Sequence, residues 1–365
     1  MPGTPGFLLN TPKRASGRQP RRGTLLDVLS DVLRVIRLSG AIFFSAEFTE
    51  PYAIESPPPP HLAARLLPTA ECLAIFHVLA QGQCWLALEG EAPLRLEQGD
   101  VIIFPHSHPH VMTSRVGTAP TALDGILPET ATDAIPHLTF GGGGSAARFV
   151  CGYLQCDQRF NPLMGALPVL LWVRRRQGVT EIESTGHGPG RRAVVLPPDA
   201  GAWLATTLGY LVAEVAAVQP GSQVMLARLA ELLYVEVLRR YAHHLPVGQT
   251  GWLAGLSDPQ VGRALRLLHS DPAHAWTVEA LARAAGVSRS ALALRFAELI
   301  GESPMHYLTA WRMHLARQIL QENRYTIPEV AERVGYNSEA AFNRAFKRYA
   351  GVPPGVWVKR DSRRP

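Results

Sequence analysis

The last hundred residues contain the same short unit twice, and this repeat limits what the chain can fold into more than any other feature. Shifting the sequence by 49 residues aligns Gly286 with Gly335, and shifting it by 50 aligns Phe296 with Phe346. The change of one residue falls in a turn, where an insertion is tolerated best. The sequence therefore predicts two copies of one small helical unit.

Each copy has the pattern of a helix-turn-helix. In the first copy Thr277 can cap a short helix, Gly286 can adopt the positive φ that ends it, and Ser288 can cap the next helix. Leu292 and Phe296, four residues apart, then share the face that packs into the core. The second helix thus begins with small polar residues and carries its apolar residues later, as expected where its first turn enters the major groove of DNA.

A longer helix is predicted between the two copies. Ser303 followed by Pro304 is a strong helix start. Apolar residues recur at helical spacing along it, at Tyr307, Leu308, Trp311, Leu315 and Ile319. About 18 residues would form a rod of about 27 Å, which suits two reading helices held one turn of DNA apart, roughly 34 Å. One chain could then contact one face of a duplex without dimerising.

The charge distribution also favours a polyanion as partner of this region. The net charge of the chain is +6, but residues 261–365 hold 16 basic and 9 acidic side chains, a net of +7. A basic module on an acidic body is typical of nucleic-acid binding. The candidates for contacts to phosphates or bases are Arg289 and Arg295 in the first copy and Arg344, Lys347 and Arg348 in the second.

Residues 259–360 resemble the DNA-binding domain of the AraC/XylS family of bacterial transcription regulators. The segment PEVAERVGYNSEAAFNRAFKRYAGVPPGVW (328–357) is close to the signature of that family. The resemblance implies base contacts from Ser290, Ala293 and Leu294 in the first copy, and from Glu339, Ala340, Ala341, Asn343 and Arg344 in the second. Ser288, Arg289, Arg295, Ser338 and Lys347 complete the predicted DNA-contacting set. The first-copy positions are small or apolar, so that copy is expected to read thymine methyl groups or DNA shape.

The N-terminal half predicts a different fold. Short β-rich runs separated by Gly and Pro turns are typical of a small all-β barrel or sandwich. GDVIIFPHSHPH (99–110) resembles the second cupin motif, with His110 at a metal-ligand position, and FHVLAQGQCWLALEG (76–90) resembles the end of the first. The first motif's His and Glu residues are missing, since Ile75 stands where the Glu would be. The resemblance implies the barrel that this regulator family uses as a sensor.

Two interpretations of the barrel histidines remain open. His77 shares a strand face with Ile75, so it should point into the barrel together with His110. With Cys84 and His108 these residues could bind zinc. Alternatively, HSHPH is a polar loop and His77 is a hydrogen-bonded interior residue.

The cysteines offer a second kind of signal. Cys151 and Cys156 are five residues apart, which places them on opposite faces of a strand and makes a disulfide between them difficult. A redox signal sensed by single thiols stays possible. Four cysteines, no signal peptide and no apolar run of about 18–20 residues favour a cytoplasmic protein without a membrane partner.

These patterns predict an α+β multidomain chain. Its regions are a disordered basic tail (1–24), a cupin-like sensor (25–200), a helical hairpin for dimerisation or linkage (201–258) and an all-α domain with two helix-turn-helix units (259–360). Within the sensor, residues 174–192 are expected to form an exposed linker.

The predicted function is sequence-specific DNA binding that regulates transcription. We expect a homodimer, controlled by a small-molecule or redox signal and contacting RNA polymerase if it is an activator. The alternative is a cupin-type metal-dependent enzyme fused to a helical module. The incomplete metal triad argues against it, so the chain is predicted not to be an enzyme.

Overall fold

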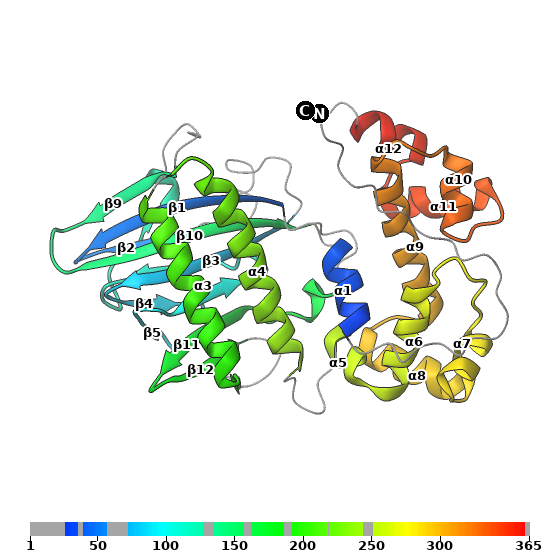
Figure 1. The fold of residues 1–365 in the computed structure, drawn as a ribbon, viewed down its shortest axis with the longest axis horizontal. Coiled ribbons are helices and arrows are strands. Elements are labelled where there is room, and N and C mark those ends of the chain that lie inside the picture. The colour runs from blue at the N-terminus through cyan, green and yellow to red at the C-terminus, as the bar shows by residue number, and fades with distance from the viewer. Residues whose placement is uncertain are drawn as a thin grey trace.

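The computed structural model describes residues 26–35, 39–56, 72–126, 135–156, 162–185, 192–217, 219–243 and 251–361. The predicted tail (1–24) lies outside these ranges. So do residues 68–71, where the first cupin motif would place its histidines. A sheet-rich part and an all-helical part lie side by side, and helix α1 (Leu26–Val35) lies between them (Figure 1). The fold is α+β, as predicted.

The sheet-rich part contains two sheets. The larger has the strand order β13-β12-β11-β6-β3-β10-β1-β9, and the smaller has the order β5-β4-β7-β2-β8. The strands of the larger sheet are β1 (Ser39–Thr49), β3 (Cys72–Gln81), β6 (Val101–Phe104), β9 (His137–Gly141), β10 (Ala146–Cys156), β11 (Leu170–Arg176), β12 (Val179–Thr185) and β13 (Arg192–Val195). Those of the smaller are β2 (Ala53–Ser56), β4 (Gln83–Ala87), β5 (Leu94–Glu97), β7 (His110–Thr113) and β8 (Thr121–Ala122).

Both faces of the larger sheet are buried. Along β3, Ile75 and His77 point toward the smaller sheet, whereas Phe76 and Val78 point the other way. This alternation follows from the two-residue period of a strand. The outward face is covered by a helical hairpin of α3 (Pro198–Ala217) and α4 (Ser222–His243) (Figure 1). The predicted helix pair over 201–243 is thereby confirmed.

The expectation of an exposed linker at 174–192 is wrong for residues 174–185, and residues 186–191 lie outside the described ranges. Arg176 pairs with Val179 across a tight turn, and β11 and β12 form an antiparallel hairpin. Arg174 lies beside Glu181 and Glu183 on the neighbouring strand. Opposite charges facing each other across two strands explain why a highly charged segment is regular structure here.

Helix α3 bears on the expectation that the chain has no apolar run long enough to cross a membrane. By length and composition it is apolar enough to cross a membrane, the one such helix among the described residues, although a third of its most apolar stretch is buried inside the protein. Its buried side chains include Leu204 and Leu211. The inner face of α3 therefore belongs to a folded core.

The all-helical part has the predicted repeat. Its helices are α5 (Trp252–Ser257), α6 (Pro259–Ser270), α7 (Val278–Ala285), α8 (Arg289–Ile300), α9 (Pro304–Gln321), α10 (Ile327–Arg333), α11 (Glu339–Ala350) and α12 (Pro354–Asp361). The first helix-turn-helix is α7–α8, the second is α10–α11, and α9 is the rod between them. The short α5 lies at the end of the region (201–258) that was predicted as a helical hairpin for dimerisation or linkage.

The two units differ in how they are packed. One hydrophobic core runs from the outer face of the larger sheet through α1 and the short 3-10 helix η2 (Met164–Ala166) into α5–α8 and the first half of α9. The second unit has a separate core, formed by the end of α9 with α10 and α11. The first unit is therefore continuous with the sensor, and the second is attached through the rod and through a close backbone approach of Gly335 to Ala273.

Candidate nucleic-acid interface

The first reading helix, α8, begins as the sequence predicts. The Thr277 hydroxyl accepts a hydrogen bond from the Ala280 N–H and caps α7. Gly286 then adopts φ +80, and the Ser288 hydroxyl accepts from the Ala291 N–H to cap α8. Leu292 is fully buried, so the helix is anchored one turn after its start.

The second reading helix, α11, is built on the same plan with tighter packing at its turn. Ser338 caps it by accepting from the Ala341 N–H. The turn before it contains Gly335 at φ +83, where an added Cβ would lie 2.6 Å from the Ala273 carbonyl oxygen. Only glycine fits this position, because both the backbone angle and the space exclude a side chain.

Both reading helices present their first turns to solvent. The exposed members of the predicted set are Ser288, Arg289, Ser290, Leu294 and Arg295 on the first unit and Ser338, Glu339, Ala340, Arg344 and Lys347 on the second. Ala293, Ala341 and Asn343 are half-buried. The Leu294 side chain is 64% exposed, which is a larger fraction than a leucine without a surface function usually has. Among the residues that the structure describes, none covers the helix starts that would enter a groove.

The cations of the first unit are held by carboxylates. Arg289 forms an ion pair with Glu279 at 2.8 Å, and Arg295 forms ion pairs with Asp258 at 3.1 Å and with Glu298 at 3.4 Å. Burial acts to raise the pKa of Asp258, but hydrogen bonds from backbone N–H groups and the nearby Arg295 outweigh burial and lower the pKa. The carboxylate is therefore charged at neutral pH. The sequence did not mark Asp258 and Glu279 as neighbours, because they belong to other helices, whereas Glu298 lies on α8 itself, three residues after Arg295.

The cations of the second unit have no such neighbours. Arg344 and Lys347 make no hydrogen bond or ion pair with any residue that the structure describes. Together with Asn343 and the chain at Pro353–Gly355 they line a pocket of about 270 Å³. Two free cations at one concave surface are suited to a phosphate oxygen.

The interior of the sensor contains a buried chain of hydrogen bonds. His77 Nδ1 lies 2.9 Å from Cys151 Sγ, and His77 Nε2 lies 2.9 Å from His110 Nε2. His110 Nδ1 lies 2.8 Å from the carbonyl oxygen of His108 and must donate to it. His110 Nε2 is then an acceptor, so His77 donates to it and accepts the thiol proton of Cys151. We assign neutral rings to both histidines on this pattern.

Burial favours the uncharged forms of Cys151, His77 and His110 in this hydrogen-bonded network. It lowers the pKa of His110 to about 4, and burial with the nearby His110 lowers the pKa of His77. Burial also raises the pKa of the Cys151 thiol. The network is therefore neutral near pH 7.

Two families of known domains match the chain. The family described as Cupin matches residues 27–185 and 191–243, which is more than half of the chain, and a helix-turn-helix domain family matches residues 281–360. An AraC-like transcription regulator of Streptomyces lividans is 34% identical over 287 residues, which cover 78% of this chain and 86% of the relative. The chain belongs to the AraC-like transcription regulators.

Two other known proteins match different lengths of the chain. The HTH-type transcriptional regulator AlkR of Acinetobacter baylyi is 27% identical, over 76% of this chain and 85% of its own. The solved DNA-binding domain of AdpA, in complex with a target DNA, is 30% identical over 30% of this chain and 97% of that domain, with a TM-score of 0.28. The chain is a DNA-binding transcription regulator with a cupin domain, and its relatives are regulators rather than enzymes.

In this AraC-like regulator the structure brings together only part of the candidate zinc-binding set. Among the described residues, no group of three His, Cys, Asp or Glu side chains is arranged to hold a metal ion. His77 and His110 do meet, but Cys84 Sγ instead contacts the carbonyl oxygens of Trp85 and Thr113. Burial raises the pKa of that thiol to about 12. The hydrogen-bonded alternative describes His77 better.

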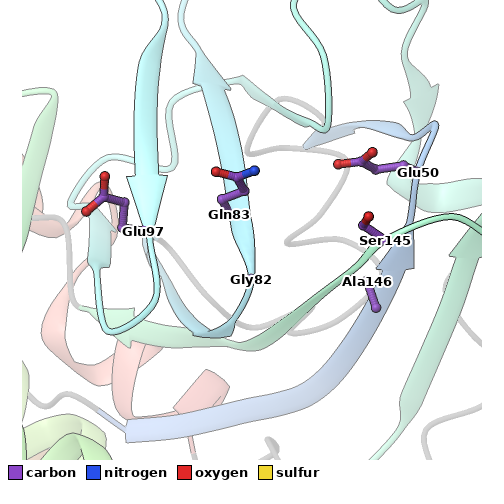
Figure 2. Close-up of a pocket in the computed structure, with 6 residues that line it drawn as sticks. All are labelled: Glu50, Gly82, Gln83, Glu97, Ser145 and Ala146. Atoms are coloured by element: carbon purple, nitrogen blue, oxygen red, sulfur yellow. The ribbon is translucent and has the colours of Figure 1, made fainter.

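A separate polar pocket of about 350 Å³ opens at the rim of the sensor (Figure 2). Glu50, Gln83, Glu97 and Ser145 line it, and Glu50 and Glu97 approach it from opposite sides. None of His77, Cys84, His108 and His110 is among its described lining residues. This pocket could not be predicted from the sequence, because its lining residues come from four separate strands and loops.

Proposed function

We propose that the regulator binds promoter DNA with both helix-turn-helix units on one face of one duplex. The observation that carries this proposal is the pair of capped, exposed helix starts at Ser288 and Ser338, joined by an 18-residue rod. At 1.5 Å per residue the rod is about 27 Å long. That length agrees with successive major grooves roughly 34 Å apart, once the widths of the reading helices are added.

The two units would read DNA in different ways. In the second unit, Arg344 and Asn343 offer donors for base edges, Glu339 offers an acceptor, and Lys347 is placed for a phosphate. In the first unit, Ser290, Ala293 and Leu294 offer small and apolar contacts, which suit thymine methyl groups and DNA shape. Sequence preference would therefore be strongest under α11.

The cytoplasmic protein would act as a homodimer, with a small-molecule or redox signal in the cupin domain changing the placement of the DNA module. Such a signal must bind two arrangements of the chain with different affinity. The continuous core between the sensor and the first unit supports a mechanical connection. If the regulator is an activator, RNA polymerase is a further partner.

The test is selection of binding sites from a random duplex library, followed by affinity measurements at several salt concentrations. The wild type should select two short conserved blocks about one turn apart and should lose affinity steeply as salt rises. Arg344→Ala should cost about 1–3 kcal/mol and relax one base position. Arg95→Ala, an equal charge change at an exposed position of strand β5, is the control and should leave both properties unchanged. An unaltered preference in Arg344→Ala would remove that residue from base reading.

A further inference from the structure

Arg312 on the rod α9 contacts both helix-turn-helix units. Its Nε donates to the carbonyl oxygen of Pro272 at 2.6 Å, and its Nη2 donates to the carbonyl oxygen of His274 at 2.8 Å. Both carbonyls belong to the loop between α6 and α7, which leads into the first unit. The guanidinium carbon also lies 5.8 Å from the centre of the Tyr336 ring, in the turn of the second unit. One half-buried side chain therefore joins the two units.

The loop that Arg312 holds is itself braced. The Asp271 carboxylate accepts a hydrogen bond from the His274 N–H at 3.1 Å, and the Asp271 carbonyl oxygen accepts from the Trp276 indole N–H at 3.0 Å. Pro272 has a fixed φ angle, which further limits the conformations of the loop. The loop is thus a firm surface against which another part of the chain can be placed.

The turn of the second unit closes on the same loop. A Cβ added to Gly335 would lie 2.6 Å from the carbonyl oxygen of Ala273. Ala273 stands between the two residues whose carbonyls bind Arg312, Pro272 and His274. The arginine and the glycine turn therefore meet three consecutive residues of the loop.

A helix-turn-helix does not by itself require this arginine contact. The shift of 49 residues that aligns Gly286 with Gly335 also aligns Arg263 on α6 with Arg312 on α9. Arg263 lies beside its own turn, with Nη1 3.9 Å from a Cβ added to Gly286. However, Arg263 is exposed and makes no hydrogen bond or ion pair with any residue in the described part of the chain. The contact is therefore particular to the place where the second unit meets the first.

We propose that Arg312 is a positioning residue that fixes the direction of the second reading helix relative to the first. The two units have separate cores, and the partly buried Leu315 and Tyr349 pack against both. Apolar contact is non-directional and does not set an angle between two bodies. Two hydrogen bonds from one planar guanidinium fix direction as well as distance. Without them the second unit turns about the rod, and the two reading helices lose the register of successive grooves.

The first experiment measures the distance between the units without DNA, by pulsed electron paramagnetic resonance on the full chain. Spin labels are attached to ketone-bearing residues introduced in place of Glu298 on α8 and Glu332 on α10, which are both exposed. The wild-type background should give one narrow distance distribution. Arg312→Ala should broaden it by about twofold or more, because the second unit then samples several orientations. Arg312→Lys keeps the charge but not the planar fork, so it should broaden the distribution less.

The control for this experiment is Arg333→Ala. The Arg333 guanidinium carbon lies 3.8 Å from the centre of the Tyr325 ring, and both residues belong to the second unit. This variant loses a contact between a guanidinium and a ring without changing any contact to the first unit. Its distance distribution should stay as narrow as that of the wild type.

The second experiment uses DNA, and in this readout the inference rests on the proposed function. It compares a selected site with the same site carrying one extra base pair between its two blocks. The wild type should bind the longer site about tenfold more weakly and Arg312→Ala about threefold or less, because a loosely held second module tolerates more spacings. Arg333→Ala should keep the wild-type ratio. Equal weakening of Arg312→Ala on both sites would show a merely structural role for this residue.

Two results would overturn the proposal. One is a distance distribution as narrow in Arg312→Ala as in the wild type, and the other is an undiminished spacing penalty in that variant. A different result would contradict the proposed function alone. If the wild type binds both spacings equally while the distribution broadens in Arg312→Ala, the units do not bind successive grooves, and the role of Arg312 stands.

Discussion

The two helix-turn-helix units have nearly the same helix plan but differ in their surroundings. The first shares a core with the sensor, and its arginines are paired with carboxylates at Asp258, Glu279 and Glu298. The second has its own core, and its Arg344 and Lys347 have no described partner. Two copies of one helix plan can therefore differ in their packing and in the charges around their reading helices.

The turn glycines should separate the two units most strongly. Gly286→Ala forces a positive φ but meets only the end of the Arg263 side chain at 3.9 Å, so about 1 kcal/mol of stability should be lost. Gly335→Ala adds a contact of 2.6 Å with a backbone oxygen, so the loss should reach about 3 kcal/mol. Urea unfolding of both variants measures the difference. Equal losses would show that the turns are equivalent.

Acid should weaken the sensor and its continuous core before the second unit. The His110 pKa is lowered to about 4 in the folded protein, below its unfolded value near 6.5, so its contribution to stability is present above pH 6.5 and is lost as pH falls toward 4. The full loss from this residue is about 3 kcal/mol. Hydrogen exchange at decreasing pH should show β3 and β7 opening while α10 and α11 stay protected.

A matched variant tests the cause of that pH dependence. His110→Gln should be less stable near pH 7, because the chain from Cys151 to His108 is interrupted. Its stability should, however, fall less steeply with acid, since the titrating ring is gone. If stability falls equally steeply with decreasing pH in His110→Gln and in the wild type, His110 is not the group that causes the pH dependence.

The linker helix α5 should depend on one buried hydroxyl. Tyr307 on α9 accepts from Trp252 Nε1 at 2.9 Å and lies 2.8 Å from His269 Nε2. Tyr307→Phe leaves both groups without this partner and should cost about 1–3 kcal/mol. Tyr325→Phe, near the second unit, is the control and should cost less. Thermal unfolding compares them, and an equal cost would deny α5 a special attachment.

The smallest expected difference concerns phosphate contacts. Lys347→Ala should weaken DNA binding uniformly across sequences and reduce the salt slope by about 1. Arg295→Ala should change that slope less, because the guanidinium already pairs with Asp258 and Glu298. Equal slopes would show that DNA displaces these carboxylates.

Much of this molecule was predictable because its signals are local. The caps at Thr277, Ser288 and Ser338 and the turn at Gly286 follow from residue type and spacing, and the structure confirms each of them. The inward direction of His77 followed in the same way from strand alternation.

The remainder depends on contacts between distant segments. Cys151 meets His77 only because β10 pairs with β3, and Asp258 meets Arg295 across two helices. The charged hairpin β11–β12 was missed because charge balance across strands is not visible along one segment. Cys84 and His108 were candidate zinc ligands for their chemistry, but their positions relative to His77 and His110 depend on the fold and are not visible in the sequence.

The most direct test of the central claim is hydroxyl-radical footprinting of the wild type and Gly335→Ala on a selected site. For the wild type we expect two protected patches on one face of the duplex, about one turn apart. For Gly335→Ala we expect the loss of only the patch under α11. A single patch for the wild type, or the loss of both patches together in the variant, would contradict two units that bind successive grooves.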